Sequence, residues 1–193
     1  MGAANVAGSS ASPGPKPRYS RAEIAAAAAE VPELTIAAVA KHLGTAPSSL
    51  YRYFDSREQM VVAAVDSVIG ALAPPRLGRS SQPWRTMLQR EVSARWTMIA
   101  AHPALIDAWW DLGWTAASSD ARRSAIVARL VEAGFSAALA DAVNDAVGGL
   151  IASAAETLLG GADAVEVHRA RRRLDLQVAL LLDGVASRLA PHS

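Results

Sequence analysis

Residues 35–57 read TIAAVAKHLGTAPSSLYRYFDSR, and this stretch decides the fold expected for the N-terminal part of the chain. Thr35 is placed to cap a helix over residues 36–43, and Gly44 follows in the position where helices commonly end. Pro47 suits the first turn of a second helix that runs to about Phe54. Two short helices joined by a tight, glycine-containing turn are typical of a helix-turn-helix, whose second helix can enter the DNA major groove.

The side chains that remain outside the predicted core of this motif are suited to DNA. Ser, Tyr and Arg can donate hydrogen bonds to phosphates, and an Arg can also pair with guanine. Arg57 begins the next helix, where its charge and the helix amide groups can hold a phosphate. An ordinary helical hairpin with a solvated polar face fits the same pattern and stays open on these residues alone. The outward-facing positions are Pro47, Ser48, Ser49, Tyr51, Arg52 and Tyr53.

Helix signals continue on both sides of this stretch. Ser20 and Glu23 form a capping box for a first helix, which Pro32 closes. Asp55 or Ser56 can cap a fourth helix that extends towards residue 73. The preceding residues 1–17, rich in Gly, Ala, Ser and Pro, are expected to be a disordered tail.

A break over residues 74–83 separates these short helices from longer ones. Apolar residues at helical spacing predict helices over 84–101, directly after residue 103, and over 119–133, 137–159 and 163–189. No segment has the period-two alternation of a strand. We therefore expect an all-α chain of about nine helices, with a tail (1–17), a helix-turn-helix domain (18–73) and a larger helical domain (74–193).

Composition excludes several classes of chemistry. The absence of cysteine rules out disulfides, thiolate metal sites and cysteine nucleophiles. The four histidines have no metal-ligand spacing, and phosphate-binding and nucleophile motifs are missing. We expect no catalytic residues, no metal and no cofactor. No apolar run reaches the 18 or more residues of a spanning helix, so we expect no membrane partner and a cytoplasmic location.

The N-terminal motif resembles the DNA-binding domain of TetR-family transcriptional regulators. The resemblance implies a regulator, and more specifically a repressor, that binds a palindromic double-stranded DNA operator as a homodimer. A small-molecule effector would bind the larger domain and release the DNA. The matching residues are Ile24, Ala27-Ala28, Thr35, Val39-Ala40, Gly44, Leu50-Tyr51, Phe54 and Arg57.

The resemblance also assigns roles within the motif. It implies that Thr35, Tyr51 and Arg57 contact the DNA backbone, with Tyr53 beside them. It places Pro47, Ser48, Ser49 and Arg52 at the variable, base-facing positions. Ala46 departs from the family, because a serine usually caps the recognition helix there, so Thr45 or water would have to replace it. Arg57 stands where lysine is commoner, which keeps the charge.

An aromatic cluster in the larger domain predicts an apolar or aromatic effector. All five tryptophans lie between residues 84 and 114, and aromatic residues at helical spacing can equally fill a core. Arg95, Asp107 and Asp111 lie nearby as polar candidates. The predicted pocket residues are Trp96, Met98, His102, Ile106, Trp109, Trp110 and Trp114.

The last two helices each carry an apolar stripe that predicts the dimer interface. Two long amphipathic helices per chain can pair with a copy as a four-helix bundle. Packing against helices of the same chain is the alternative. The predicted interface residues are Val143, Val147, Leu150, Ala154, Leu158, Leu174, Val178, Leu181 and Val185.

Two other functions remain compatible with these patterns. One is an all-helical small-molecule carrier or enzyme that contains a hairpin like a helix-turn-helix. The other is a helical adaptor that binds a protein through residues 139–189. DNA binding must also come from well-placed cations and dimerisation, because residues 1–73 contain six basic and six acidic side chains.

Overall fold

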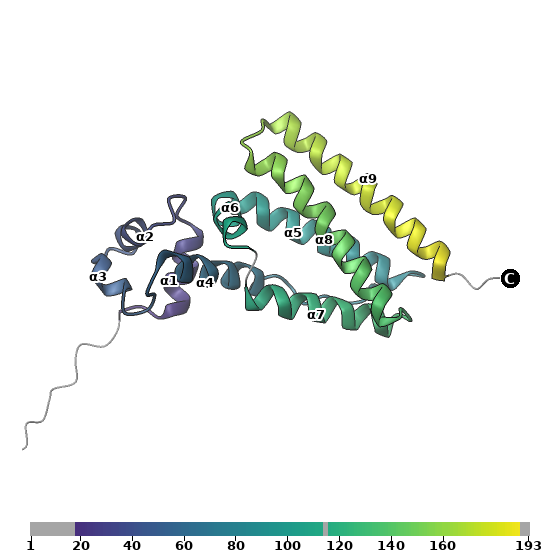
Figure 1. The fold of residues 1–193 in the computed structure, drawn as a ribbon, viewed down its shortest axis with the longest axis horizontal. Helices are drawn as coiled ribbons and strands as arrows, with labels where there is room; N and C mark the ends of the chain where they lie inside the picture. The colour runs from purple at the N-terminus through teal and green to yellow at the C-terminus, as the bar shows by residue number, and fades with distance from the viewer. Residues whose placement is uncertain (1–17, 114–115, 190–193) are drawn as a thin grey trace, which may run out of the picture.

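The computed structural model describes residues 18–113 and 116–189, which form nine helices and no strand (Figure 1). The predicted tail, residues 1–17, lies outside the described residues. The first four helices are α1 (Arg21–Ala29), α2 (Ile36–His42), α3 (Pro47–Leu50) and α4 (Arg57–Gly70). The remaining five are α5 (Pro83–Ala101), α6 (Pro103–Asp111), α7 (Ala117–Glu132), α8 (Ala137–Leu159) and α9 (Ala164–Leu189).

Side-chain caps start several helices where the sequence predicts them. The Ser20 hydroxyl accepts from the backbone N–H of Glu23 at 3.2 Å, and the Glu23 carboxylate accepts from the N–H of Ser20 at 2.6 Å. Thr35 caps α2 by accepting from Ala38, and Ser56 caps α4. These bonds satisfy amide groups that have no partner within the helix.

Helix α3 is shorter than predicted. It ends at Leu50, and residues 51–53 form a turn in place of the helix expected as far as Phe54. Ala46 at its start makes no side-chain capping bond, and neither does Thr45. The backbone N–H groups of Tyr53 and Phe54 both donate to Leu50, which tightens the last turn.

Helix α4 connects the two parts of the molecule. Helices α1 to α3 lie at one end, and α4 runs from them towards α5 to α9 (Figure 1). Its buried residues include Met60, Ala64 and Ile69, which pack against α1 as well as α6 and α7. The hydrophobic core is therefore continuous across the domain boundary predicted at residue 73.

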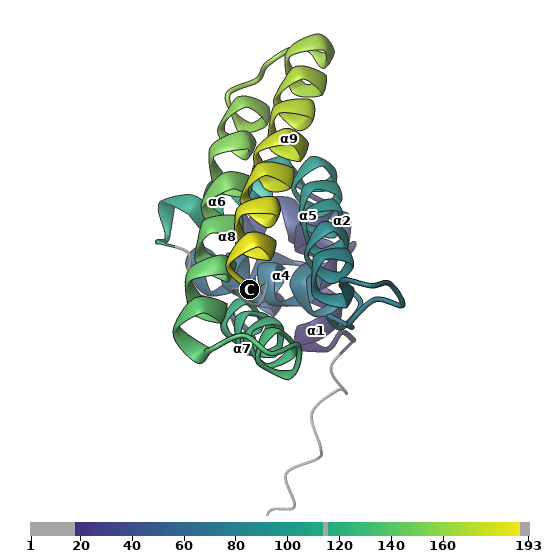
Figure 2. The same cartoon turned by 90° about the vertical axis from the view of Figure 1, so that its right-hand side faces the viewer.

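Helices α8 and α9 are antiparallel and lie side by side along one flank of the larger domain (Figures 1 and 2). Five of the nine predicted interface residues are buried inside the protomer: Val143, Val147, Leu174, Val178 and Val185. The other four, Leu150, Ala154, Leu158 and Leu181, are half-buried against the same core. The five buried residues therefore pack within the protomer, where α8 contacts α5, α6, α7 and α9, and the assignment of an interface to α8 and α9 stays a prediction.

None of the helices in the described residues is both long and apolar enough to cross a membrane.

Candidate nucleic-acid interface and ligand cavity

Hydrogen bonds to backbone carbonyls fix the helix-turn-helix on the start of α1. The Tyr19 hydroxyl donates to the carbonyl of Leu43 at 2.5 Å, at the end of α2. The Tyr53 hydroxyl donates to the carbonyl of Tyr19 at 2.6 Å, and Arg21 donates to the carbonyl of Tyr53. The Arg21 guanidinium also lies 4.4 Å from the centre of the Phe54 ring. These contacts orient α2 and α3 as one unit.

Most of the predicted DNA-contacting side chains project from this unit. Pro47, Ser48 and Arg52 are exposed, and Ser49 is half-buried. Tyr51 is 56% exposed. Within the described residues, neither the Tyr51 hydroxyl nor the Arg52 guanidinium forms a hydrogen bond, so both groups are available to an external partner.

Three other predicted DNA-contacting residues form hydrogen bonds within the domain. The Arg57 Nε donates to the carbonyl of Leu34 at 2.9 Å and so braces a residue with a φ of +46°. The exposed Thr35 uses its hydroxyl oxygen as the cap of α2. Tyr53 is half-buried and its hydroxyl donates to the carbonyl of Tyr19, so this contact stabilises the domain itself.

The positive charges of this region are not neutralised by neighbouring carboxylates. The seven ion pairs among the described residues all lie between residues 85 and 183. The cations of the region from residue 18 to residue 73 therefore have no acidic partner within 4 Å in the described structure. They are Arg18, Arg21, Lys41, Arg52 and Arg57. These unpaired cations give the domain positive charge at particular positions although its net charge is close to zero.

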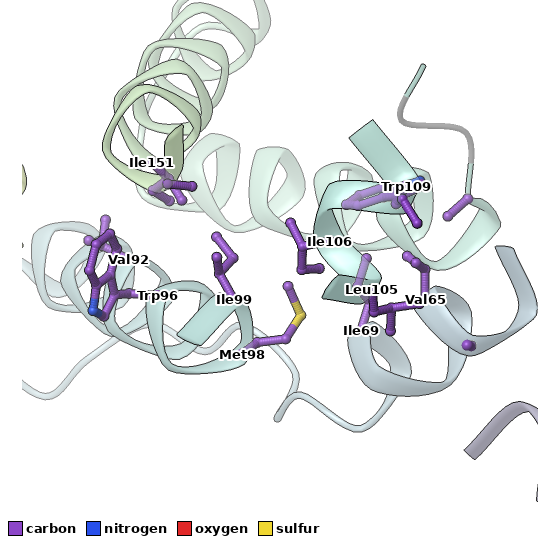
Figure 3. Packing of buried hydrophobic residues seen from close by; sticks show 14 of the residues in the cluster. Val65, Ile69, Val92, Trp96, Met98, Ile99, Leu105, Ile106, Trp109 and Ile151 are labelled. Carbon is purple, nitrogen blue, oxygen red and sulfur yellow. The ribbon is translucent and has the colours of Figure 1, made fainter. Parts of the chain in front are cut away.

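The larger domain contains a cavity of about 510 Å³ between α4, α5, α6, α7 and α8. Its size falls within the range of about 300–1,000 Å³ found for ligand pockets. Three predicted pocket residues, Met98, Ile106 and Trp109, line it. Figure 3 shows Met98, Ile99 and Ile106 between α5 and α6. The other apolar walls are Ile69, Leu72, Ile99 and Ile151.

Three further predicted pocket residues that the structure describes, Trp96, His102 and Trp110, do not line this cavity. Trp96 is buried beside Val92, away from Met98 and Ile106 (Figure 3). His102 places its Nδ1 3.0 Å from the carbonyl oxygen of Ala29. Trp110 lies outside the lining, and Trp114 is not among the described residues. A helix turns 100° per residue, so neighbours in sequence point to different surroundings.

Several cavity residues were missed because they come from α7 and α8. Asn144 and Gly148 lie far along the chain from the tryptophans, Arg122 belongs to the next helix, and Gly148 fits equally well with close helix packing. Arg95, considered from the sequence, does line the cavity, whereas Asp107 and Asp111 are exposed and do not. The local sequence contains no signal that would bring α7 and α8 to this site.

A buried charge cluster lies beside the cavity. The Glu91 carboxylate is 6% exposed and accepts two hydrogen bonds of 2.9 Å from Arg122, which is 9% exposed. The Nε of Arg95 is 3.9 Å from the same carboxylate, beyond hydrogen-bonding distance. Burial lowers the pKa of Arg95, Glu91 opposes this, and the positive charge of Arg122 adds to the lowering.

The first half of α7, which contains Arg122, also forms hydrogen bonds with α4 and with the residues that follow it. Arg122 donates to the carbonyls of Leu72 and Ala73, at 3.4 and 3.1 Å. The Asp66 carboxylate accepts from the backbone N–H and the hydroxyl of Ser118, at 2.8 and 2.6 Å. One helix that lines the cavity thus holds the helix that enters the helix-turn-helix domain.

No group of three or more His, Asp or Glu side chains in the described ranges could hold a metal ion.

Residues 20–64 match the family model of bacterial regulatory proteins of the tetR family. No curated protein sequence matches the chain. Three solved structures are similar in fold. A substituted form of TetR from Acinetobacter baumannii AYE in complex with minocycline is 16% identical, with a TM-score of 0.72 over 90% of this chain and 99% of that one. The transcriptional regulator SCO7222, a TetR from Streptomyces coelicolor, is 20% identical, with a TM-score of 0.70 over 90% and 100% of the two chains. BioQ with its double-stranded DNA operator, a protein also solved from Mycobacterium smegmatis, is 20% identical, with a TM-score of 0.63 over 88% and 99%.

Proposed function

Because the N-terminal domain of this chain belongs to the tetR family of bacterial regulatory proteins, we propose that the chain is a transcriptional repressor. It binds a palindromic DNA operator as a homodimer and releases it when a small molecule enters the cavity of the larger domain. The observation that carries the proposal is a helix-turn-helix with free donors on its outer face, joined through α4 to a cavity of ligand size. Binding to a bacterial operator would place the chain in the cytoplasm.

DNA binding is proposed for the exposed tip of the helix-turn-helix. Tyr51 and the outer nitrogens of Arg57 would contact phosphates, and Thr35 would lie against the same strand. Arg52, with the neighbouring Pro47, Ser48 and Ser49, would face the base edges, where an arginine can pair with guanine. Tyr53 supports this surface from within, since its hydroxyl is engaged with Tyr19.

Dimerisation is proposed for the outer face of α9 and the adjoining surface of α8. Among the described residues, five large hydrophobic side chains are exposed, and three of them lie on this face of α9. Val165, Leu176 and Leu180 are 63%, 61% and 63% exposed. A two-fold pairing there buries these side chains and brings two recognition units together, as half-sites about 34 Å apart require.

The switch is proposed to pass through α7. This helix contributes cavity residues and holds α4 through the Arg122 and Ser118 hydrogen bonds. A ligand that displaces α7 would therefore tilt α4 and change the separation of the two DNA-binding units. Moving such an equilibrium from 99:1 to 1:99 needs about 5.5 kcal/mol of differential affinity, and the coupling is reciprocal.

Selection from a random pool of DNA duplexes tests the proposal directly. The protein is expected to enrich a palindrome, and Arg52→Ala is expected to relax preference at one position in each half-site. Tyr51→Ala should weaken binding to all duplexes and reduce the salt dependence. The exposed Val131→Ala, remote from the tip, is the matched control and should bind normally. Failure to bind any duplex at low salt would refute the repressor and leave a small-molecule carrier, for which the cavity is the supporting feature.

A further inference from the structure

The charged groups around the cavity divide into a solvated rim and a buried cluster. At the rim, Arg123 pairs with Asp145 and Asp141, and the side chains of Arg123 and Asp145 are 44% and 57% exposed. Asp120 is also exposed. Asp141 and Asp145 are thus paired with an arginine, and Asp120, which forms no ion pair within the described residues, is exposed to water, so the negative charges at the rim are screened.

In the buried cluster, positive charges outnumber negative ones. It contains two guanidinium groups, Arg95 and Arg122, and one carboxylate, Glu91. Both arginines line the cavity, whereas Glu91 lies behind them and does not. The cluster thus presents an excess positive charge to a partly open and mostly apolar space.

Arg95 is the less satisfied of the two arginines. Arg122 uses both carboxylate oxygens of Glu91 and two backbone carbonyls. Arg95 makes no hydrogen bond to the part of the chain that the structure describes, and its side chain is only 21% exposed. A guanidinium so far removed from water is costly unless an anion or other acceptors satisfy its donors.

We propose that the cavity binds an apolar small molecule bearing a carboxylate, and that this carboxylate pairs with Arg95. The planar guanidinium matches a carboxylate with two parallel hydrogen bonds. The body of the ligand lies against the isoleucine and tryptophan side chains that α4, α6 and α8 contribute. A neutral or cationic ligand of the same shape would leave Arg95 unsatisfied or repel it.

This inference rests on the proposed function, since it names the ligand class of the same cavity. It adds a specific route to the switch. A carboxylate beside Arg95 lies next to Glu91, which repels it, and Glu91 holds Arg122. Binding would thus disturb the arginine that is fastened to the end of α4.

Two matched ligand series test the charge requirement on the DNA-free protein. The first is decanoate, decan-1-ol and decylamine; the second is naphthalen-2-ylacetate with the corresponding alcohol and amine. Calorimetry should give an affinity for each carboxylate that is at least about tenfold higher than for its alcohol, as expected for a hydrogen-bonded charged pair. The amine should bind most weakly. Equal binding within a series, or no binding in either series, would overturn the inference.

Variants of the protein distinguish the effect of the charge of Arg95 from the effect of the shape of the cavity. Arg95→Gln should remove the preference for the carboxylate and leave the affinity for the alcohol within about threefold, while Arg95→Lys should restore part of the preference. Gly148→Leu is the matched control, because a Cβ at Gly148 meets no atom within 4 Å and the new side chain can occupy the cavity. It should weaken acid and alcohol equally. An unchanged preference in Arg95→Gln, or unchanged binding in Gly148→Leu, would refute the assigned site.

Operator affinity, measured with and without decanoate, distinguishes this inference from the proposed function. Carboxylate binding that depends on Arg95 but does not alter operator affinity would uphold the ligand class and refute the effector role. DNA binding by a protein that shows no preference for carboxylates would refute the ligand class and leave the proposed DNA-binding function standing. If Arg95→Gln does not fold, the wild-type series still decides the sign of the charge preference.

Discussion

The N-terminal domain and the larger domain use their arginines in opposite ways. In the first, Arg21 and Arg57 donate to backbone carbonyls and no cation has a carboxylate within 4 Å, counting the described residues alone. In the second, Arg122 is buried on Glu91, and Arg85, Arg123, Arg129 and Arg171 also pair with carboxylates. A carbonyl orients a guanidinium without neutralising it, so the first domain keeps charge for an external partner, while in the second the pairs of Arg85, Arg122 and Arg123 join different helices.

The largest expected effect of this contrast is on folding stability. Glu91→Gln leaves Arg95 and Arg122 buried without a counter-charge, and it should lower the free energy of unfolding by about 3–5 kcal/mol. Urea unfolding followed by circular dichroism measures the change. Asp145→Asn removes one partner of a solvated pair and should cost less than about 1 kcal/mol. Equal losses in the two variants would contradict the distinction between a buried and an exposed cluster.

The next effect concerns the two faces of α9. Leu180→Asp alters an exposed position and should raise the dimer dissociation constant at least about a hundredfold, which corresponds to about 2.7 kcal/mol. Sedimentation velocity measures it. Val178→Asp, by contrast, puts a carboxylate into the protomer core and should unfold the chain instead of yielding folded monomers. A Leu180→Asp variant that remains dimeric would refute the proposed outer-face interface.

A smaller effect is expected from the carbonyl-directed bonds of the N-terminal domain. Tyr53→Phe removes the hydroxyl that donates to Tyr19 and should lower stability by about 1 kcal/mol, because a half-buried hydrogen bond is lost. Thermal unfolding reports the change. The exposed Tyr51→Phe makes the matched control and should leave stability unchanged while weakening DNA binding. Equal stability losses would indicate that Tyr51 also has an internal partner.

The smallest effect is a difference in salt response at acidic pH. The pKa of Glu23 is lowered mainly by the backbone N–H of Ser20, whereas the pKa of Asp145 is lowered mainly by hydrogen bonding to Arg123. A lowered folded-state pKa means that each carboxylate stabilises the protein above its unfolded pKa, near 4, and that this contribution is lost as the pH falls through the folded pKa.

Acid unfolding of the wild type, Glu23→Gln and Asp145→Asn at low and high salt measures the two contributions. High salt should diminish that of Asp145, because an exposed ion pair is screened, and should change that of Glu23 less. For Asp145 the contribution is expected to be below about 1 kcal/mol, since the pair is solvated. Identical salt responses would contradict the assignment of different partners.

The helix-turn-helix was predictable because it depends on short-range interactions. Thr35, Ser20 and Ser56 cap helices through bonds to amides three residues away. The lengths of α3 and α4 were overestimated, since α3 gives way to a turn after Leu50 and α4 ends at Gly70. The hydrogen bond of Tyr53 could not be predicted, because its partner Tyr19 lies 34 residues away and no local pattern indicates that contact.

The surroundings of the cavity and of the apolar faces of α8 and α9 could not be predicted from local patterns for the same reason. Apolar periodicity identifies a buried face on α8 and α9 but does not state what covers it, and α8 packs against α5, α6 and α7 as well as α9. Trp96 and Met98 are two residues apart, yet only Met98 reaches the cavity. Pocket membership depends on how α5, α6, α7 and α8 cross, which sequence spacing leaves open.

By itself, the sequence determined an all-helical chain, its helix starts and a DNA-binding motif at the N-terminus, because caps and periodicity act within one or two helical turns. The tertiary structure alone decided which apolar faces remain exposed and which charges are buried together. Glu91 and Arg122 are separated by 31 residues, and Arg122 and Leu72 by 50. Contacts at such separations exist only after the helices have packed, so the charge cluster beside the cavity is a property of the fold.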